Sequence, residues 1–190
     1  LQQLIAIPSF SKQEEQTAML IQSFLEEKGC TVHRRGNNVW TYNTHFDATK
    51  PLLLLNSHHD TVKPNSGYTR DPFLPTIEAG KLYGLGSNDA GGALVCLLGT
   101  FLHFKDRIDL PFNLIYAATA EEEISGVNGI ESIIQELPNV ELAIVGEPTL
   151  LQMAVAERGL LVLDCTSIGK AGHAARNEGV NAIYQAMEDI

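Results

Sequence analysis

Apolar residues recur along the chain with two different periods, and these periods predict which segments are helices and which are strands. Residues 17–28 carry apolar side chains at helical spacing and are followed by Gly29, a residue type that commonly ends a helix. Ser11 and Glu14 stand three residues apart just before this segment, so we expect them to form a capping box. The same spacing predicts two more helices, over residues 93–104 and 127–137.

Three continuous apolar runs predict strands that are buried on both faces, the usual situation in a parallel sheet. These runs are residues 52–57, 112–118 and 142–145, and an alternating segment at 39–43 predicts one more strand. Because strands and helices alternate along the chain, we expect an α/β fold with a largely parallel sheet flanked by helices.

The hydrophobic pattern changes after Pro148. Residues 160–168 alternate with a period of about two and are followed by a glycine-rich turn and another helical segment. We therefore expect two domains, a main α/β domain over residues 1–152 and the first part of a smaller α+β domain over 153–190. The chain does not begin with Met, and its last helical segment reaches Ile190 without a stop signal, which is typical of a fragment.

Composition and charge narrow the classes of partner. The 190 residues are 44% hydrophobic, enough for one substantial core, and the net charge is -10. Since the only tight basic cluster is residues 33–35, we expect no nucleic-acid partner. No apolar run approaches the roughly 20 residues that cross a bilayer, so we expect no membrane partner. Three separated cysteines without a CxxC pair indicate reduced thiols in a cytoplasmic protein.

Acidic residues and histidines follow the three predicted buried strands. The candidates are His58, His59 and Asp60 after the first strand, Glu121, Glu122 and Glu123 after the second, and Glu147 after the third. Asp89 lies in a glycine-rich loop between these clusters. Because loops at the carboxyl ends of strands in an open α/β sheet meet over one crevice, we expect these groups to lie together. A mixed set of imidazole and carboxylate groups suits Zn²⁺ or a related divalent ion.

Each cluster has an ordinary structural explanation when it is taken alone. Acidic residues favour helix N-termini, so the glutamates at 121–123 also fit a solvated helix start. Asp89 fits a turn residue, and Glu147 before Pro148 fits a loop charge. The co-occurrence of four polar clusters after strands or glycines of one sheet favours the metal site. The sequence has no dinucleotide fingerprint, no GKS or GKT phosphate loop and no GxSxG serine motif.

Five motifs together resemble the two-zinc acylase, deacetylase and carboxypeptidase superfamily. In chain order they are SHHD at 57–60, GLGSND at 84–89, TAEEEISG at 119–126, VGEPT at 145–149 and GKAGHAAR at 169–176. The phrases IAIPSFS, GLGSNDAGG and IVGEPT are most similar to the acetylornithine deacetylase branch, which includes relatives that use succinylornithine. This resemblance implies a zinc exopeptidase-like catalytic domain followed by a ferredoxin-like lid and dimerisation domain.

The resemblance also implies an activity and a role for each candidate residue. The enzyme would be a metal-dependent hydrolase of linear amide bonds that removes an N-acyl group from an amino acid in arginine biosynthesis. The implied ligands of two Zn²⁺ ions, with Co²⁺ or Mn²⁺ as substitutes, are His58, Asp89, Glu123 and Glu147, and Asp89 would bridge the ions. Asp60 would orient His58, Glu122 would be the general base, and His173 would stabilise the oxyanion, commonly from the partner subunit of a homodimer. The family feature of a cis peptide bond is expected between Asp89 and Ala90.

Two positions depart from the family's pattern, and the substrate stays open. Ala90, Gly91 and Gly92 follow Asp89 where the family commonly has a lysine, and Glu121 stands where aspartate is common. The last histidine ligand of the family is expected outside this chain. The same motifs serve succinyl-diaminopimelate desuccinylases, aminoacylases and dipeptidases. An inactive metal-binding scaffold homologue is the alternative that is not an enzyme.

Overall fold

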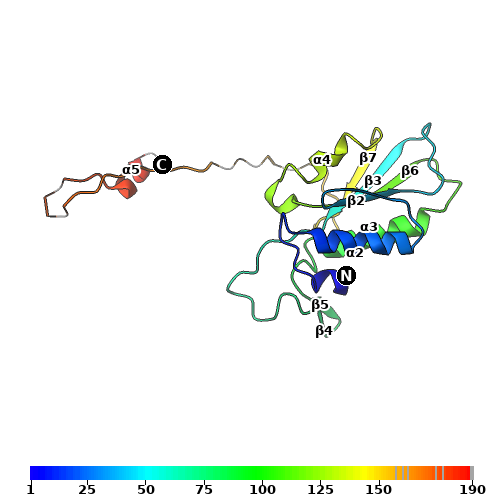
Figure 1. The fold of residues 1–190 in the computed structure, drawn as a ribbon, viewed down its shortest axis with the longest axis horizontal. Coiled ribbons are helices and arrows are strands. Elements are labelled where there is room, and N and C mark those ends of the chain that lie inside the picture. The colour runs from blue at the N-terminus through cyan, green and yellow to red at the C-terminus, as the bar shows by residue number, and fades with distance from the viewer. Residues whose placement is uncertain (157, 160, 162, 174, 177, 189–190) are drawn as a thin grey trace. The chain divides into compact units, whose positions relative to one another are not determined.

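The computed structural model describes residues 1–188 except 157, 160, 162, 174 and 177 (Figure 1). The chain divides into two compact units, Leu1–Gln152 and Met153–Ile190. Among the described residues, no helix has both the length and the hydrophobicity needed to span a bilayer.

The first unit is built on a five-stranded mixed sheet with the strand order β1-β2-β6-β3-β7. The strands are β1 (Val32–Arg35), β2 (Asn38–Tyr42), β3 (Leu52–His58), β6 (Asn113–Thr119) and β7 (Leu142–Val145). The central strand β3 is parallel to both β6 and β7, while β1 and β2 form an antiparallel hairpin that joins the sheet at β6. The α/β fold class is thus confirmed. The strands β3 and β6 form the buried centre of the sheet, and the hairpin makes the whole sheet mixed. The prediction that residues 142–145 are buried on both faces is wrong, because β7 lies at an edge of the sheet and all four of its residues are exposed.

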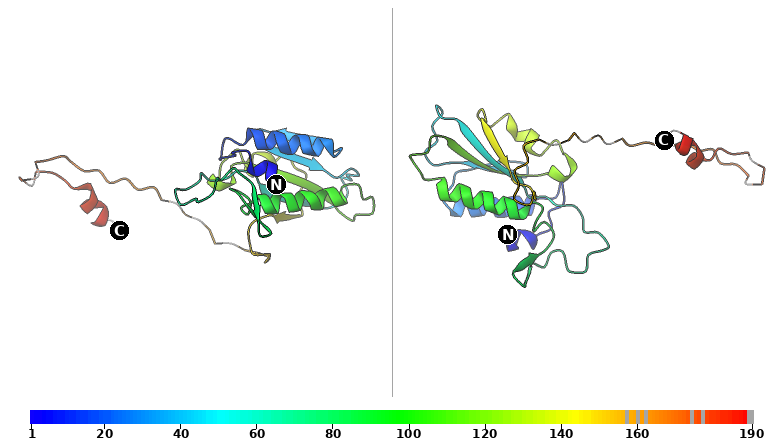
Figure 2. Two further views of the ribbon diagram at one scale, coloured as in Figure 1. Left: turned by 90° about the horizontal axis from the view of Figure 1, so that it is seen from below. Right: turned by 180° about the vertical axis from the view of Figure 1, so that it is seen from behind.

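Helices cover both faces of this sheet, as the α/β pattern predicts. The helices α2 (Glu15–Glu27) and α3 (Gly91–Phe104) lie side by side on one face, and α4 (Ile130–Ile134) packs on the other (Figures 1 and 2). Alternate strand residues divide between these layers, since Leu55 and Tyr116 pack with α2 and α3 whereas Leu54 and Ile115 pack with α4. The strands β3 and β6 therefore have continuous apolar runs in the sequence because both of their faces are buried.

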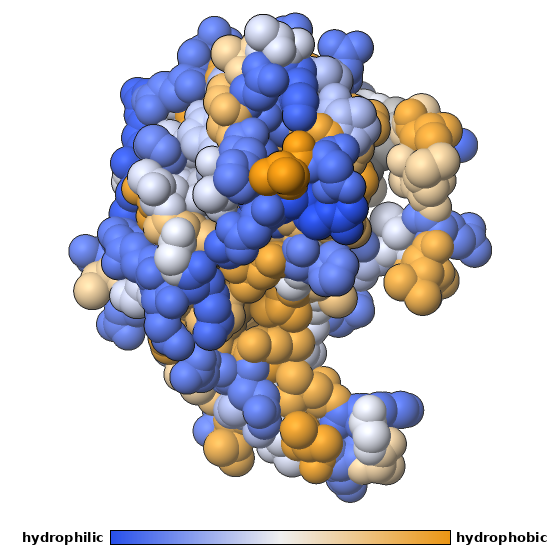
Figure 3. Space-filling view, turned by 90° about the vertical axis from the view of Figure 1, so that its right-hand side faces the viewer, coloured by the Kyte–Doolittle hydropathy of each residue, from blue (hydrophilic) through white to orange (hydrophobic). Residues whose placement is uncertain are grey.

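The remaining elements of the first unit are short. They are α1 (Gln2–Ile5), the antiparallel pair β4 (Thr76–Glu78) and β5 (Lys81–Tyr83), and the 3-10 turn η1 (Glu122–Ile124). Hydrophobic residues, drawn in orange in Figure 3, reach the surface between hydrophilic areas. One apolar groove of about 210 Å³ lies among α1, α2 and α3, lined by residues that include Leu4, Phe24 and Leu98.

Two local predictions are corrected by the structure. The capping box is wrong: Glu14 is the N-cap residue of α2, but it makes no side-chain capping hydrogen bond, because its carboxylate and the Ser11 hydroxyl bind other parts of the chain. The helix predicted over 127–137 is only five residues long, since the segment before Gly129 is taken up by a turn. Gly29 does end α2 as predicted, with a left-handed φ of 74°.

The described residues of the second unit form the helix α5 (Ala182–Glu188) and a bridge between Lys170 and Val180. The helix expected after the glycine-rich turn is therefore present. No strand forms at 161 or 163–168 in the described part of the predicted 160–168 strand, and residues 160 and 162 lie outside the described residues.

Candidate metal centre

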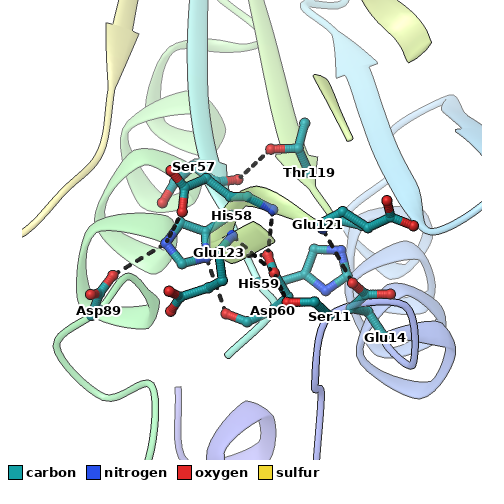
Figure 4. Close-up of polar contacts among 12 residues, drawn as sticks. Ser11, Glu14, Ser57, His58, His59, Asp60, Asp89, Thr119, Glu121 and Glu123 are labelled. Atoms are coloured by element: carbon teal, nitrogen blue, oxygen red, sulfur yellow. Dashed lines mark hydrogen bonds and ion pairs between the residues drawn. The ribbon is translucent and has the colours of Figure 1, made fainter. Parts of the chain in front are cut away.

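Three parallel strands end at one edge of the sheet, and each is followed by groups able to bind a metal. His58 is the last residue of β3 and pairs in register with Thr119, the last residue of β6. Strand β7 pairs with the other side of β3. Because the three strands run in the same direction, the glutamates after β6 and after β7 leave the sheet at the edge where His58 lies. Figure 4 shows Glu123, from the segment after β6, beside His58.

His58 faces several carboxylates at this edge. Its Nε2 atom lies 3.2 Å from Oδ1 of Asp89 and 3.7 Å from a carboxylate oxygen of both Glu122 and Glu147. Potential ligand atoms lie within 4.8 Å of one another in two groups, which are His58, Asp89 and Glu123, and His58, Glu122 and Glu147. The structure thus brings the four predicted ligands and the predicted base into one crevice, and His58 belongs to both groups.

Asp60 fixes the orientation of the His58 ring. The Nδ1 atom of His58 lies 3.0 Å from the backbone carbonyl oxygen of Asp60 and 3.3 Å from its carboxylate. A carbonyl oxygen only accepts, so Nδ1 carries a hydrogen and Nε2 is the nitrogen directed at Asp89. A carboxylate that orients a metal-binding histidine commonly makes this arrangement.

Asp60 also holds the turn that carries Glu122 and Glu123. The backbone N–H groups of these two glutamates donate to the two oxygens of the Asp60 carboxylate, at 3.1 and 3.3 Å. The turn is bracketed by Glu121 and Ser125, whose φ angles of 54° and 49° are left-handed. Such a conformation costs a residue other than glycine about 1–3 kcal/mol, so the turn requires bonds to the surrounding structure to maintain it.

Glu121 differs in role from the two glutamates that follow it. Its side chain is buried and points away from His58 (Figure 4), and its carboxylate accepts hydrogen bonds from the side chain and the backbone N–H of Asn128. Gly126 packs against this side chain, because a Cβ atom there would lie 2.1 Å from Oε2 of Glu121. The first glutamate therefore anchors the turn, while Glu122 and Glu123 are left for the crevice.

The electrostatics of the crevice suit a divalent cation. Burial by itself lowers the pKa of His58, but hydrogen bonds and charges of Asp60 and Glu147 outweigh it and raise the pKa to about 11. Burial raises the pKa of Glu122 and Glu123, and neighbouring carboxylates add to this effect. In the described part of the chain, no lysine or arginine forms an ion pair with these acids. The donor set thus fits a metal ion, which would supply the positive charge that these carboxylates otherwise lack.

The loop before α3 places the Asp89 carboxylate next to Nε2 of His58. The peptide bond between Asp89 and Ala90 is cis, as the resemblance implies. Gly86 has a φ of 72°, and a Cβ atom on Gly91 would lie 2.4 Å from the Gly86 carbonyl oxygen, so the loop is too tight for larger residues. A cavity of about 350 Å³ opens beside Asp89 and Glu123, which leaves room for a small substrate.

His59 is separated from this chemistry by its orientation. It is buried, its Nδ1 contacts the Thr17 hydroxyl at 2.9 Å, and its Nε2 contacts the Asn37 carbonyl oxygen at 2.9 Å. Burial lowers the pKa of His59. Both ring nitrogens are therefore used in bonds between segments, and His59 is a structural residue.

Two residues beside the site, Ser11 and Glu14, have a spacing that predicts a helix cap, because it satisfies that local rule completely. Nothing in the local pattern indicates that their side chains reach Asp60 and Glu121 instead. His173, the remaining predicted residue, is exposed in the second unit, and its role remains a prediction.

Comparison with known proteins gives one family match. Residues 54–189 match the family described as Peptidase family M20/M25/M40. Acetylornithine deacetylase of Proteus mirabilis (strain HI4320) is 34% identical over 203 residues, which cover 99% of this chain and 52% of that protein. Succinyl-diaminopimelate desuccinylase of Delftia acidovorans (strain DSM 14801 / SPH-1) is 27% identical over 207 residues, covering 98% and 54%. This chain thus spans about half the length of these two relatives.

A solved structure has the same fold. The M20 family metallo-carboxypeptidase Sso-CP2 from Sulfolobus solfataricus matches with a TM-score of 0.62 and 26% sequence identity. The match covers 76% of this chain and 36% of that one.

Proposed function

The chain belongs to peptidase family M20/M25/M40, and from this premise we propose that it is the metal-binding part of an enzyme that removes N-acyl groups from amino acids. The resemblance found in the five sequence motifs is thereby confirmed at the level of the family. The observation that carries the proposal is the single crevice in which His58 meets the carboxylates of Asp89, Glu122, Glu123 and Glu147.

Four side chains are proposed to hold two metal ions. His58, Asp89, Glu123 and Glu147 would together hold the ions, because potential ligand atoms of His58 lie close to those of all three carboxylates. Zn²⁺ is the proposed ion, with Co²⁺ or Mn²⁺ as substitutes, because the donors are a mixture of imidazole and carboxylate. When bound, such a pair supplies a water of lowered pKa as nucleophile and polarises the substrate carbonyl group.

Glu122 is the proposed general base. Its carboxylate lies in the crevice next to His58, and its backbone is fixed by Asp60. The carboxylate would take a proton from the attacking water and deliver it to the leaving amine as the amide bond breaks. Burial raises the pKa of Glu122, which favours a group that both accepts and returns a proton near neutral pH.

His173 is proposed to donate a hydrogen bond to the oxyanion. The Nδ1 atom of His173 accepts the backbone N–H of Ala175 at 3.2 Å, which leaves Nε2 as the hydrogen-bearing nitrogen, and no acceptor for it is found among the described residues. We propose that the unit containing His173 is the beginning of a lid and dimerisation domain, and that the donor serves the site of the partner in a homodimer. The division of the chain between residues 152 and 153 supports this domain assignment.

N-acetylornithine is the proposed substrate, in a cytoplasmic step of arginine biosynthesis. The 34% identity to an acetylornithine deacetylase over nearly the whole chain supports this choice. N-succinylornithine is the closest chemical variant. N-succinyl-diaminopimelate is the second candidate, because the relative from Delftia acidovorans carries the name of that desuccinylase.

A substrate panel tests the proposal. The full-length protein would be loaded with Zn²⁺ and assayed on N-acetylornithine, N-succinylornithine, N-succinyl-diaminopimelate and a dipeptide. We expect the highest kcat/KM for N-acetylornithine. A higher kcat/KM for another compound of the panel would make that compound the assigned substrate. A metal-loaded protein that hydrolyses none of the four compounds would support the alternative of an inactive scaffold.

A further inference from the structure

Glu14 is a fully buried carboxylate for which the proposed mechanism has no role. Its Oε1 atom accepts the backbone N–H of Lys12 at 2.7 Å and that of Glu121 at 3.2 Å, and its Oε2 atom accepts the Asn37 side-chain amide at 2.8 Å. No lysine or arginine among the described residues forms an ion pair with it. A buried carboxylate persists only where donors compensate its lost hydration, and here three N–H groups do so.

One of these donors belongs to the turn that carries the proposed base. The backbone N–H of Glu121 donates to Glu14, and the next two N–H groups, of Glu122 and Glu123, donate to Asp60. Three consecutive N–H groups of a strained turn are therefore held by two buried carboxylates. Glu14 fixes the left-handed residue at which the turn begins, and Asp60 fixes the two residues that face the crevice.

Both carboxylates are tied to the segment before α2. The Ser11 hydroxyl donates to Asp60 at 2.7 Å, three residues before Glu14. This segment is itself fixed, because Gln13 N–H donates to the Phe10 carbonyl oxygen, and Phe10 forms a bridge with Thr61, the residue after Asp60. The side chains of Ser11 and Glu14, which the sequence assigns to a helix cap, instead bind Asp60 and the N–H of Glu121 at the start of the acidic turn (Figure 4).

We propose that Ser11 and Glu14 are positioning residues that set the direction of Glu122 and Glu123 in the crevice. The inference rests on the proposed function for its catalytic consequence, while the structural part stands on the hydrogen bonds alone. A local sequence rule is expected to fail beside a functional site where the residues support the site instead of the local structure.

Two substitutions of Glu14 distinguish the effect of its hydrogen bonds from the effect of its charge. In Glu14→Ala, the N–H groups of Lys12 and Glu121 and the Asn37 amide all lose their acceptor. In Glu14→Gln, the remaining side-chain oxygen still accepts both backbone N–H groups. Turning the Asn37 amide over then pairs its oxygen with the new NH₂ group, so the turn is retained.

Two measurements on the full-length protein test the proposal. The first is hydrogen exchange of the peptide covering 119–126 in metal-free protein, and the second is kcat and KM of metal-loaded protein. The control is Thr41→Val. Thr41 is as buried as Glu14, and its hydroxyl group donates to the Thr31 carbonyl oxygen, away from the turn. Metal content and Tm are recorded for every variant.

We expect Glu14→Ala to exchange faster over 119–126 and to lose about 10²-fold in kcat with little change in KM, because misplaced groups cost rate more than binding. Glu14→Gln should restore most of both, and Thr41→Val should lower Tm without changing either. If Glu14→Ala does not fold, the smaller change Ser11→Ala should show faster exchange over the same peptide and a lower kcat.

Normal exchange over 119–126 in Glu14→Ala, or in Ser11→Ala where that variant is used, would overturn the proposal. Faster exchange over the same peptide in Thr41→Val would overturn it as well, because the effect would then be one of general stability. A wild-type protein that hydrolyses no substrate would contradict the proposed function alone, since the exchange experiment does not depend on activity.

Discussion

The Ser11 hydroxyl donates a hydrogen bond of 2.7 Å to the carboxylate of Asp60, 49 residues further along the chain. Asp60 also accepts the N–H groups of Glu122 and Glu123 and lies beside the hydrogen-bearing Nδ1 of His58. Each of these four groups around the Asp60 carboxylate is a hydrogen-bond donor. Burial raises the pKa of Asp60, but the pKa is lowered on balance, and hydrogen bonds with His58 and Ser11 contribute to this lowering.

Asp60→Asn should therefore weaken metal binding. The amide NH₂ group would meet a donor whichever way the side chain turns, so both the His58 ring and the acidic turn lose part of their support. We expect metal affinity to fall about 10- to 100-fold, measured by titration with a competing chelator. Asp47→Asn is the matched control, because Asp47 also accepts a backbone N–H but lies in a loop without contact to the site. Equal affinities in Asp60→Asn and wild type would contradict the role of Asp60.

Glu122→Gln and Glu123→Gln should have opposite effects on metal and turnover. The first should keep the metal and lose about 10²- to 10⁴-fold in kcat, because the amide cannot accept a proton. The second should lose metal affinity, because the charge of a proposed ligand is removed. Metal content by mass spectrometry and kcat together separate the two. Loss of metal in Glu122→Gln with retention in Glu123→Gln would show instead that Glu122 is the ligand and Glu123 the base.

Gly126→Ala should displace the acidic turn. The new Cβ atom would lie 2.1 Å from Oε2 and 2.7 Å from Cβ of Glu121, so the side chain that anchors the turn has to move. We expect a loss of about 1–3 kcal/mol in the free energy of unfolding and a lower kcat. Gly99→Ala, in the exposed middle of α3 with no atom within 4 Å of the added Cβ, should be neutral or stabilising. A Gly126→Ala variant with wild-type stability and kcat would show that the turn adapts.

The buried centre of the fold was predictable because its signal is carried by the strands themselves. The runs at 52–57 and 112–118 correspond to the buried strands β3 and β6 within one residue. The run at 142–145 matches the strand β7 in its bounds but not in burial, because β7 lies exposed at the edge of the sheet. The strand β1 was not predicted, because its sequence VHRR has one apolar residue in four and lies at the edge of the sheet. Edge strands bury less, so their composition says less about their structure.

The site was predictable as far as strand ends and motifs determine it. The groups that follow three parallel strands meet because the topology requires it, and the register of β3 with β6 places His58 beside the acidic turn. The supporting bonds of Ser11 and Glu14 were not predictable, since a capping box satisfies the same residues locally. Only the packing of the segment before α2 against Asp60 and Glu121 shows which bonds form.

Removal and return of the metal tests the central claim most directly. The full-length protein would be stripped with a chelator, assayed on N-acetylornithine, and assayed again after titration with Zn²⁺. We predict that stripped protein is inactive and that activity returns in proportion to bound metal, reaching full turnover at about two ions per chain, the stoichiometry of a two-metal site. Undiminished hydrolysis by protein shown to be free of metal would contradict the claim that His58 and the surrounding carboxylates form a metal-dependent active site.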